Sequence, residues 1–215
     1  GNGTATAEVG SIKSGSVSRV IVDDAGSKYR VGETVTFTTE EGTVIRFNDA
    51  RRFGMVDLSA SDSVLQHRLL KQLGPEPLSN DFTELSFRQM LRSKKTSIKN
   101  ALLDQKVVAG LGNIYVCESL FRSNISPKRL ALNVKGKRLK TLSLNIREVL
   151  NEAILAGGSS LRDHAQTNGD IGYFQHNFMV YGREGQACKK NGCGNKVKRI
   201  IQSGRSTFYC AKCQS

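Results

Sequence analysis

The chain lacks the features that would place it in a membrane or in a repetitive fold. No apolar run approaches the roughly 20 residues that cross a bilayer, and the first residues do not form the charged-then-apolar pattern of a signal peptide. The sequence shows no internal repeat and no heptad pattern, which excludes a solenoid and a coiled coil. We therefore expect one large or two small globular domains with no membrane association.

Acidic residues are scarce, with 19 Asp and Glu against 32 Lys and Arg in 215 residues, for a net charge of +13. Such an excess favours a polyanionic partner, because each neutralised phosphate releases condensed counterions. On charge alone, DNA, RNA and phosphate-bearing membranes fit equally. Residues 1–40 hold four basic and five acidic residues, so the remaining 175 carry +14. The basic surface is therefore expected after residue 40.

The chain has five cysteines, an odd number, so a disulfide framework is not expected. Four of them, Cys188, Cys193, Cys210 and Cys213, follow a C-x4-C and C-x2-C spacing separated by sixteen residues. This spacing predicts one tetrahedral zinc ion (Zn2+). The zinc is expected to be structural rather than catalytic, because four thiolates leave no coordination position for water. The surrounding segment has few long apolar side chains, so the metal must supply folding energy. Cys117 lies in an apolar helical pattern and is predicted to be a core residue, and the reducing cytoplasm is the expected compartment.

The first third of the chain has the alternating, β-branched pattern of strands. Residues 16–22 and 33–39 are predicted strands, joined by the turn residues 23–27 into a hairpin, and 34–39 pairs onward with 43–47. From residue 62 the apolar period becomes helical. Helices are predicted from 62 to about 73, over 84–93, from the cap Thr96 or Ser97 to Leu103, over 114–122 and over about 134–156. The fold class is therefore α+β.

Two segments between the predicted helices could bind an anion. Lys94-Lys95-Thr96-Ser97-Ile98-Lys99 is a basic cluster at a helix start, for which a solvated charged face is the plainer interpretation. Gly110-Leu111-Gly112-Asn113 precedes another helix, where glycines let backbone N–H groups approach an anion and Asn113 adds a side-chain donor. The alternative is a tight helix–helix turn. The pattern is not a dinucleotide fingerprint, because G-x-G-x-x-G is incomplete and no βαβ unit surrounds it.

Taken together and in order, several segments resemble the bacterial formamidopyrimidine-DNA glycosylase / endonuclease VIII family. They are Asn48 to Gly54, the run Leu73-Gly74-Pro75-Glu76-Pro77-Leu78, Lys95 to Lys99, Leu102 to Tyr115, Gly172-Tyr173-Phe174, Val180-Tyr181-Gly182-Arg183 and Gly204 to Cys210. The resemblance runs from about Thr36 to the C-terminus. It implies removal of oxidised purines from DNA followed by cleavage of the abasic strand, by a β-domain, a helix–two-turn–helix domain and a C-terminal zinc β-hairpin.

The resemblance also implies a role for individual residues. Arg51 and Phe53 match the wedge that fills the gap left by a flipped nucleotide, where a cation and an aromatic ring suit the orphaned base. Lys94 matches a phosphate contact, and Asn113 would hold the DNA backbone beside the lesion. Arg205, at the hairpin tip, matches an arginine that contacts phosphate and assists the second elimination. Residues 166–175 match a loop that closes over the extruded base.

The catalytic groups of that family are not matched in this sequence. They are an N-terminal proline whose secondary amine attacks the sugar, a glutamate that acts as an acid, and a lysine of the β-domain. In place of the proline and the glutamate, this chain begins Gly1-Asn2-Gly3. Pro75 cannot replace the proline, because inside a chain its nitrogen is an amide. The Gly1 amine is not placed near Arg51 or Arg205 by any feature of the sequence. We expect the nucleophile to be absent from this chain.

The residue patterns and the resemblance together imply five segments. They are a Gly/Ser/Thr-rich β segment of unrelated type over 1–35, a partial N-terminal β-domain over 36–58, the helix–two-turn–helix domain over 59–157, a lesion-capping loop over 158–179 and the zinc hairpin over 180–215. The first could be a natural fusion, the product of a truncated gene or an artefactual join.

Three functions fit this organisation. The first is a damaged-DNA binding module of a repair glycosylase without catalysis, acting as a cytoplasmic, nucleoid-associated monomer on double-stranded DNA with oxidised or abasic sites. The second is an active glycosylase/AP lyase whose true N-terminus lies outside this sequence. The third is a non-enzymatic zinc-ribbon protein that binds RNA or another protein.

Overall fold

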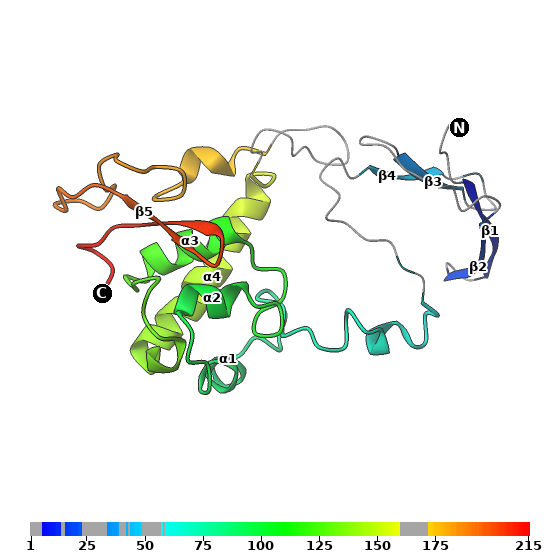
Figure 1. Cartoon of the computed structure of the whole chain (residues 1–215), viewed down its shortest axis with the longest axis horizontal. Helices are drawn as coiled ribbons and strands as arrows, with labels where there is room; N and C mark the ends of the chain where they lie inside the picture. The colour runs from blue at the N-terminus through cyan, green and yellow to red at the C-terminus, as the bar shows by residue number, and fades with distance from the viewer. Residues whose placement is uncertain are drawn as a thin grey trace. The chain divides into compact units, whose positions relative to one another are not determined.

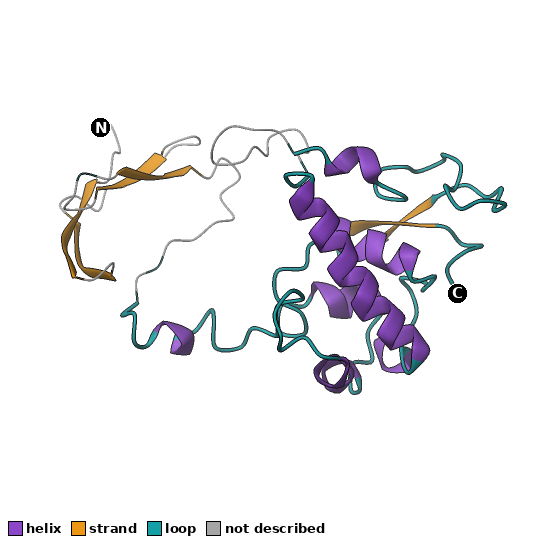
Figure 2. Cartoon of the chain, turned by 180° about the vertical axis from the view of Figure 1, so that it is seen from behind, coloured by secondary structure: helices purple, strands orange, loops and turns teal. Residues whose placement is uncertain are grey.

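The computed structural model describes residues 6–13, 16–22, 34–38, 42, 44–48, 57, 59–159 and 172–215. The chain divides into two compact units, Gly1–Lys71 and Gln72–Ser215. The first unit carries a β-sheet (blue in Figure 1), and the second carries the four α-helices of the described residues and a C-terminal hairpin (Figures 1 and 2). The combination confirms the α+β class.

The sheet of the first unit has the strand order β2-β1-β3-β4. Its strands are β1 (Thr6–Lys13), β2 (Ser16–Val22), β3 (Thr34–Thr38) and β4 (Val44–Asn48). The predicted pairing of β3 with β4 is confirmed, with Thr36 opposite Arg46. The predicted hairpin between 16–22 and 33–39 is wrong, because β2 pairs with β1, and β1 pairs in parallel with β3. Alternation identifies a strand but carries no information on its partner.

The helix predicted from residue 62 is also wrong. The structure has only a 3₁₀ turn there, η1 (Val64–Gln66), followed by turns. The apolar side chains that suggested the helix remain exposed, with Leu65 at 75%, and Leu69 and Leu70 less so. A short helix in water is marginal without an apolar face to bury, so the period alone could not form one.

The second unit is built on the helices that the sequence predicts. They are α1 (Glu84–Leu91), α2 (Ile98–Leu103), α3 (Asn113–Arg122) and α4 (Lys137–Leu155). A capping box between Thr83 and Ser86 starts α1, and the Ser97 hydroxyl accepts from the Asn100 amide to cap α2. The apolar stripe predicted for α4 is buried at Leu139, Leu142 and Ile146, but Ile154 is 63% exposed, and Val149 and Ala153 take its place in the core.

The helix α3 is the central element of this unit. Val116 and Leu120 on one side pack into the core shared by the four helices, whereas Cys117 and Phe121 pack against the C-terminal hairpin. A third cluster joins the end of α4 to η3 (Phe174–Asn177) through Val149, Ala153, Phe174 and Phe178. Because α3 is buried on both sides, it fixes the hairpin relative to the other helices.

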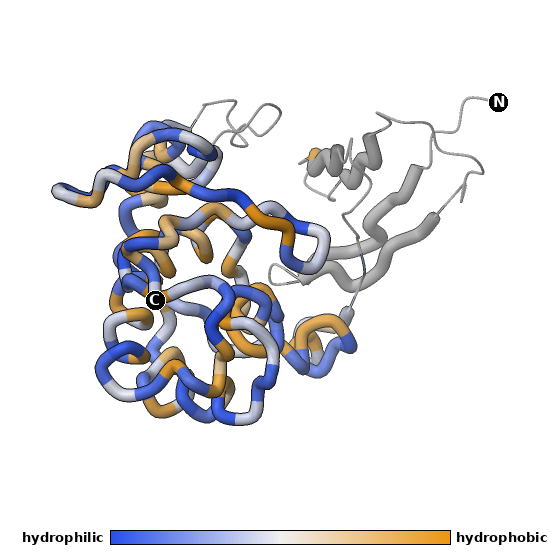
Figure 3. The backbone as a smooth tube through the Cα atoms, turned by 60° about the vertical axis from the view of Figure 1, so that its left-hand side comes forward, coloured by the Kyte–Doolittle hydropathy of each residue, from blue (hydrophilic) through white to orange (hydrophobic). Residues whose placement is uncertain are grey.

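The hairpin consists of β5 (Lys198–Gln202) and β6 (Arg205–Tyr209), which pair antiparallel. Figure 3 shows short hydrophobic and hydrophilic stretches alternating along the helical unit. In the part of the chain that the structure describes, no helix is long and apolar enough to span a membrane.

Candidate nucleic-acid interface and zinc centre

The four C-terminal cysteines form one cluster, as the spacing predicts. Their sulfur atoms lie within 4.8 Å of one another, with Sγ–Sγ distances of 3.9 Å for Cys188 and Cys213, 3.6 Å for Cys193 and Cys210, and 3.3 Å for Cys193 and Cys213. A tetrahedron with Zn–S bonds of about 2.3 Å has edges of about 3.8 Å. The donor set therefore fits a structural zinc ion, and the longer C-x4-C knuckle does not displace a ligand.

The ionisation of these thiols shows why the cluster needs a cation. A hydrogen bond from the Asn195 backbone amide lowers the pKa of Cys193 to about 7, so this sulfur is readily a thiolate. Burial, followed by the neighbouring thiols, raises the pKa of Cys213 to about 12. Four clustered sulfurs cannot all carry charge without a positive ion among them, and zinc supplies it.

The zinc hairpin presents Arg205 at its tip. Gln202 pairs with Arg205 across a two-residue loop in which Ser203 and Gly204 have φ values of 47° and 72°. Positive φ at both positions is the type I′ geometry that matches the strand twist, and glycine favours it. Arg205 is exposed and is the first residue of β6, so its guanidinium is available at the end of a rigid ribbon.

The backbone next to Arg205 is held by two helices at once. The carbonyl oxygen of Ser206 accepts from Asn113 Nδ2 at 3.0 Å and from Lys99 Nζ at 3.4 Å. Asn113 opens α3 and Lys99 lies in α2, so Asn113 and Arg205, which the sequence singles out, come together in the fold. The other atom of the amide, Asn113 Oδ1, is buried and accepts from no residue in the described part of the chain.

Two further contacts fasten the hairpin tip to α2. Asn100 Nδ2 donates to Ser203 Oγ at 2.8 Å, and Gln202 Nε2 donates to Ser97 Oγ at 3.2 Å. Ser97 is also the N-cap of α2, so one hydroxyl serves both the helix start and the hairpin. The tip is therefore positioned by side-chain hydrogen bonds on both strands of the ribbon.

The Gly110–Asn113 turn leaves the start of α3 open. Gly110 has φ +75°, and Gly112 is the N-cap without a side-chain capping bond. The first backbone N–H groups of a helix have no intrahelical acceptor, and the aligned peptide dipoles add partial positive charge there. The hydrogen bond between Asn113 and the Ser206 carbonyl brings Arg205, the neighbour of Ser206, to this end of α3. The start of α3 and Arg205 can therefore bind a phosphate together.

Lys94, the predicted phosphate contact, is paired with a carboxylate in this structure. Its Nζ lies 2.8 Å from Asp104 Oδ2, and this bond is the main reason that the pKa of Asp104 is lowered. Asp104 is the C-cap of α2. The ion pair is partly exposed, and such pairs contribute only about 0–1 kcal/mol, so Lys94 can leave it for a phosphate at small cost.

Sequence reasoning missed Glu118, a fully buried carboxylate in the middle of α3. Its oxygens accept from three successive backbone amides, of Met179 at 2.9 Å, Val180 at 3.0 Å and Tyr181 at 2.8 Å. These residues lead into the zinc hairpin, so Glu118 ties that segment to α3. A lone acid within the apolar run Ile114 to Phe121 was the available signal.

The role of Lys99 was also missed, because the basic cluster was interpreted as a solvated surface. Its side chain is fully buried, and burial is the main cause of a lowered pKa, with Arg205 contributing by charge repulsion. Leu102 lies one helical turn further along and is buried too. Because Lys99 and Leu102 are spaced i, i+3, they lie on the same face of α2. This spacing was the signal that could have predicted a buried Lys99 and an exposed Lys95.

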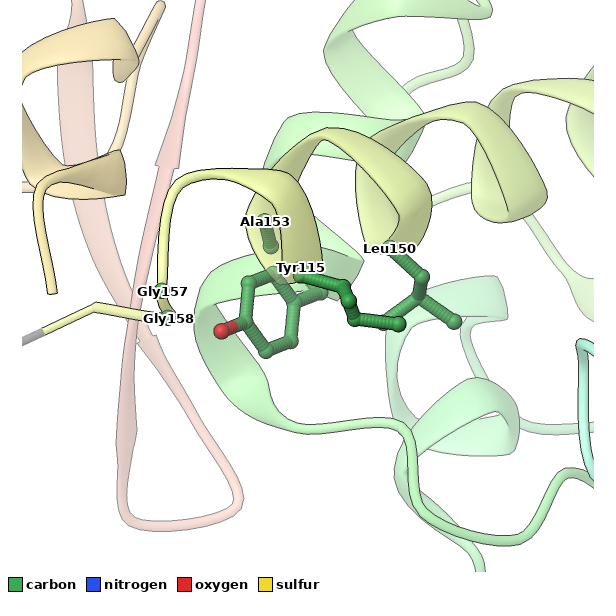
Figure 4. Close-up of a pocket in the computed structure, with 6 residues that line it drawn as sticks. Tyr115, Leu150, Ala153, Gly157 and Gly158 are labelled. Carbon is green, nitrogen blue, oxygen red and sulfur yellow. The ribbon is translucent and has the colours of Figure 1, made fainter. Parts of the chain in front are cut away.

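A pocket of about 360 Å³ opens beside the end of α4. Figure 4 shows Tyr115, from α3, beneath the last turns of α4, with its hydroxyl toward Gly157 and Gly158. The other lining residues are Leu150, Ala153 and Ile154, so the pocket offers apolar contact and no charged group.

The chain passes this pocket twice, at residues 156–159 and 172–174. The Tyr173 amide donates to the Ala156 carbonyl at 2.9 Å, and the Phe174 amide donates to Gly158 at 3.0 Å. A Cβ atom on Gly172 would lie 2.3 Å from the Gly158 carbonyl oxygen, so only glycine fits this crossing. Most of the predicted lesion-capping segment, residues 160–171, lies outside the described residues, as do Arg51 and Phe53 of the predicted wedge.

Comparison with known proteins identifies both parts of the second unit. A family model described as the formamidopyrimidine-DNA glycosylase H2TH domain matches residues 73–165, and one described as the zinc finger found in FPG and IleRS matches residues 185–215. The formamidopyrimidine-DNA glycosylase of Ruegeria pomeroyi is 56% identical over 180 residues, which cover 84% of this chain and 64% of the relative. The relative from Bradyrhizobium sp. (strain BTAi1) is 52% identical over 193 residues, covering 87% of this chain and 66% of its own length.

Solved structures agree with this result. The MutM (FPG) protein from Thermus thermophilus is 39% identical, with a TM-score of 0.76 and coverage of 87% of this chain and 70% of that protein. The Lactococcus lactis Fpg in complex with abasic-site DNA is 37% identical, with a TM-score of 0.76 and coverage of 88% and 68%. This chain thus spans about two thirds of the length of its relatives. The H2TH domain, the zinc finger and these identities together place the chain in the formamidopyrimidine-DNA glycosylase family.

Proposed function

We propose that residues 72–215 bind duplex DNA at damaged or abasic sites, as the recognition part of a repair glycosylase/AP lyase that acts on oxidised purines. The chain covers 64% of the Ruegeria relative, so base excision is proposed for the whole protein and lesion-DNA binding for the residues described here. Relatives solved with abasic-site DNA and with Fapy-dG DNA support a DNA partner.

The observation that carries the proposal is the shared Ser206 carbonyl. It joins the hairpin tip to Asn113 and Lys99, so the backbone that carries the exposed Arg205 and the open start of α3 are held at a fixed separation. A guanidinium and free helix N–H groups are both phosphate donors. Two phosphate donors held at a fixed separation select a particular backbone path, such as that of a kinked strand.

The cysteines and the buried lysine of the described residues support DNA binding rather than bond cleavage by this part. Burial raises the pKa of the Cys117 thiol to about 11, so it stays protonated and shielded at neutral pH. Lys99 has a lowered pKa, but its side chain is fully buried and points to the Ser206 carbonyl. The other four cysteines form the cluster that fits a zinc ion.

Fluorescence anisotropy with a duplex carrying a tetrahydrofuran abasic analogue, and with the matching undamaged duplex, tests the binding proposal. Arg205→Ala is expected to weaken binding to both by roughly tenfold and to reduce the salt slope by about one counterion. Lys94→Ala should have the same kind of effect but a smaller one, because the ion pair with Asp104 competes. Lys140→Ala, an exposed cation on α4, is the matched control. Equal losses in Arg205→Ala and Lys140→Ala would refute a specific site.

Arg51→Ala and Phe53→Ala address the wedge. Since a wedge contacts DNA only when a nucleotide is flipped, these variants should weaken binding to the abasic duplex more than to the undamaged one. Equal weakening of binding to the abasic and the undamaged duplex would show that Arg51 and Phe53 act only as part of a general DNA-binding surface.

Borohydride trapping on a duplex containing 8-oxoguanine separates binding from cleavage. The described residues predict no covalent adduct, and an adduct would assign the nucleophile to this chain. Competition with a structured RNA tests the zinc-ribbon alternative, which requires RNA to displace duplex DNA.

A further inference from the structure

A second basic surface lies on α1, apart from the hairpin tip. A groove of about 350 Å³ runs between α1 and residues 132–135. Its floor is formed by the buried side chains of Leu91 and Val134, and the half-buried Leu132 continues it. Leu85, at the rim, is 65% exposed. The groove therefore presents an apolar strip that is open to solvent.

The rim of this groove carries only positive charge. Arg88, Arg92 and Lys135 line it, all three side chains are exposed, and no carboxylate is among the lining residues. Within the described part of the chain, none of the three forms an ion pair. Leu85, Arg88 and Arg92 follow at i, i+3 and i+7, so one face of α1 combines an apolar anchor point with two guanidinium groups.

We propose that this groove binds a short acidic segment of another protein, which inserts one apolar side chain between flanking aspartates or glutamates. Charge complementarity selects the acidic residues, and the apolar floor selects the anchor. Arginine suits carboxylates in particular, because its planar fork donates two parallel hydrogen bonds.

Two other occupants fit the groove less well. A DNA backbone would satisfy the cations but would leave Leu85, Leu132 and the floor without apolar contact. A second copy of this chain, docked face to face, would bring two sets of three cations together, and the chain as a whole carries +13. Of the DNA-binding residues proposed above, neither Asn113 nor Arg205 lines the groove, and α1 lies below the β5–β6 hairpin in both views (Figures 1 and 2). Lys94 lies beside the groove, where its carbonyl oxygen accepts from the Leu132 amide at 3.2 Å, but Lys94 does not line it.

Fluorescence anisotropy of the full chain with labelled acidic peptides tests the proposal. The probes are Asp/Glu-rich peptides with a central Leu, Ile, Met or Phe, and a control peptide has Ser at the centre. At least one apolar-centred peptide should bind more tightly than the Ser peptide by roughly tenfold, the difference that burial of one such side chain provides. Leu85→Ser should remove this difference.

The charge requirement is tested with a matched pair of double variants. Arg88→Glu with Arg92→Glu should weaken peptide binding by roughly tenfold or more. Lys137→Glu with Lys140→Glu makes the same change in net charge at exposed positions of α4 outside the groove, and should change binding by about twofold at most.

Four binding results would overturn the proposal. They are binding of none of the peptides, equal binding of the Ser peptide, equal losses in the two double variants, and a loss of undamaged-duplex affinity in Arg88→Glu with Arg92→Glu as large as the loss of peptide affinity. The last result would make the groove part of the DNA surface. Concentration-dependent dimerisation that Leu85→Ser abolishes would identify a second copy of the chain as the occupant and would equally overturn it.

Discussion

Replacing Glu118 by glutamine exchanges one carboxylate oxygen for an NH₂ group in the centre of the second unit, where the carboxylate accepts from three backbone N–H groups. One carboxylate oxygen accepts from Val180 and Tyr181, and the other accepts from Met179. In glutamine, one of these atoms becomes an NH₂ group. If the amide oxygen keeps the Val180 and Tyr181 bonds, the NH₂ group faces the Met179 N–H, and two donors then meet inside the protein.

The cost follows from the geometry of these three bonds. The two bonds that persist change from charged to neutral acceptors and lose about 1 kcal/mol each, and the Met179 amide, left without an acceptor, costs about 2 kcal/mol. Glu118→Gln should therefore lower the free energy of unfolding by about 4 kcal/mol. For a unit of this size, that corresponds to a fall in melting temperature of roughly 10–15 °C.

Thermal unfolding of the zinc-loaded protein measures this loss, and zinc release to a colorimetric chelator reports on the hairpin that these amides lead into. Glu148→Gln makes the same chemical change at an exposed position of α4 and should stay within about 0.5 kcal/mol of the wild type. If the two variants melt at the same temperature and release zinc at the same rate, then the Glu118 bonds do not hold the hairpin on α3, and the reasoning is refuted.

Two further predictions concern the same unit. Gly172→Ala should lower the free energy of unfolding by about 1–3 kcal/mol in urea unfolding, because the added Cβ would lie 2.3 Å from the Gly158 carbonyl oxygen. Gly112→Ala should lower it by less, because the added Cβ would meet open space. A larger loss in Gly112→Ala than in Gly172→Ala would contradict the close approach of residues 158 and 172. The bidentate pair of Arg122 and Glu152, with N–O distances of 2.5 and 2.6 Å, lowers the pKa of Glu152, so its stabilisation is present above the unfolded-state pKa and is lost as pH falls through the folded-state value. In urea unfolding, Glu152→Gln should thus be less stable than the wild type by roughly 0.5–1 kcal/mol at pH 7. This gap should close as the pH falls through the lowered folded-state pKa of Glu152. A gap independent of pH would contradict the assignment.

The sequence predicted the local elements of the second unit because their signals are local. A hydroxyl cap at Ser97, a glycine turn before α3 and an apolar repeat along α4 each act within one or two helical turns. The same signals failed where a tertiary partner decides the outcome. The apolar period after residue 62 has nothing to bury against in the described structure and yields only η1, and β2 pairs with β1 although alternation alone allowed β3.

The zinc site could be predicted almost completely, since ligand type and spacing define a tetrahedral thiolate centre and the fold brings the four sulfurs within 4.8 Å. The DNA-binding residues could be named only through resemblance to a family. Their arrangement depends on bonds such as that between Asn113 and Ser206, 93 positions apart, which no periodicity encodes.

By itself, then, the sequence determined the zinc ligands, the basic balance after residue 40 and the helices with their caps, because each depends on residue type and short spacing. Only the tertiary structure decided that Lys99 is buried beneath the Ser206 carbonyl, 107 positions away, and that Glu118 holds the segment entering the hairpin. Both are charged groups removed from water. Burial of such groups is stable only when packing brings hydrogen-bond partners to them, and that packing involves residues from distant parts of the chain.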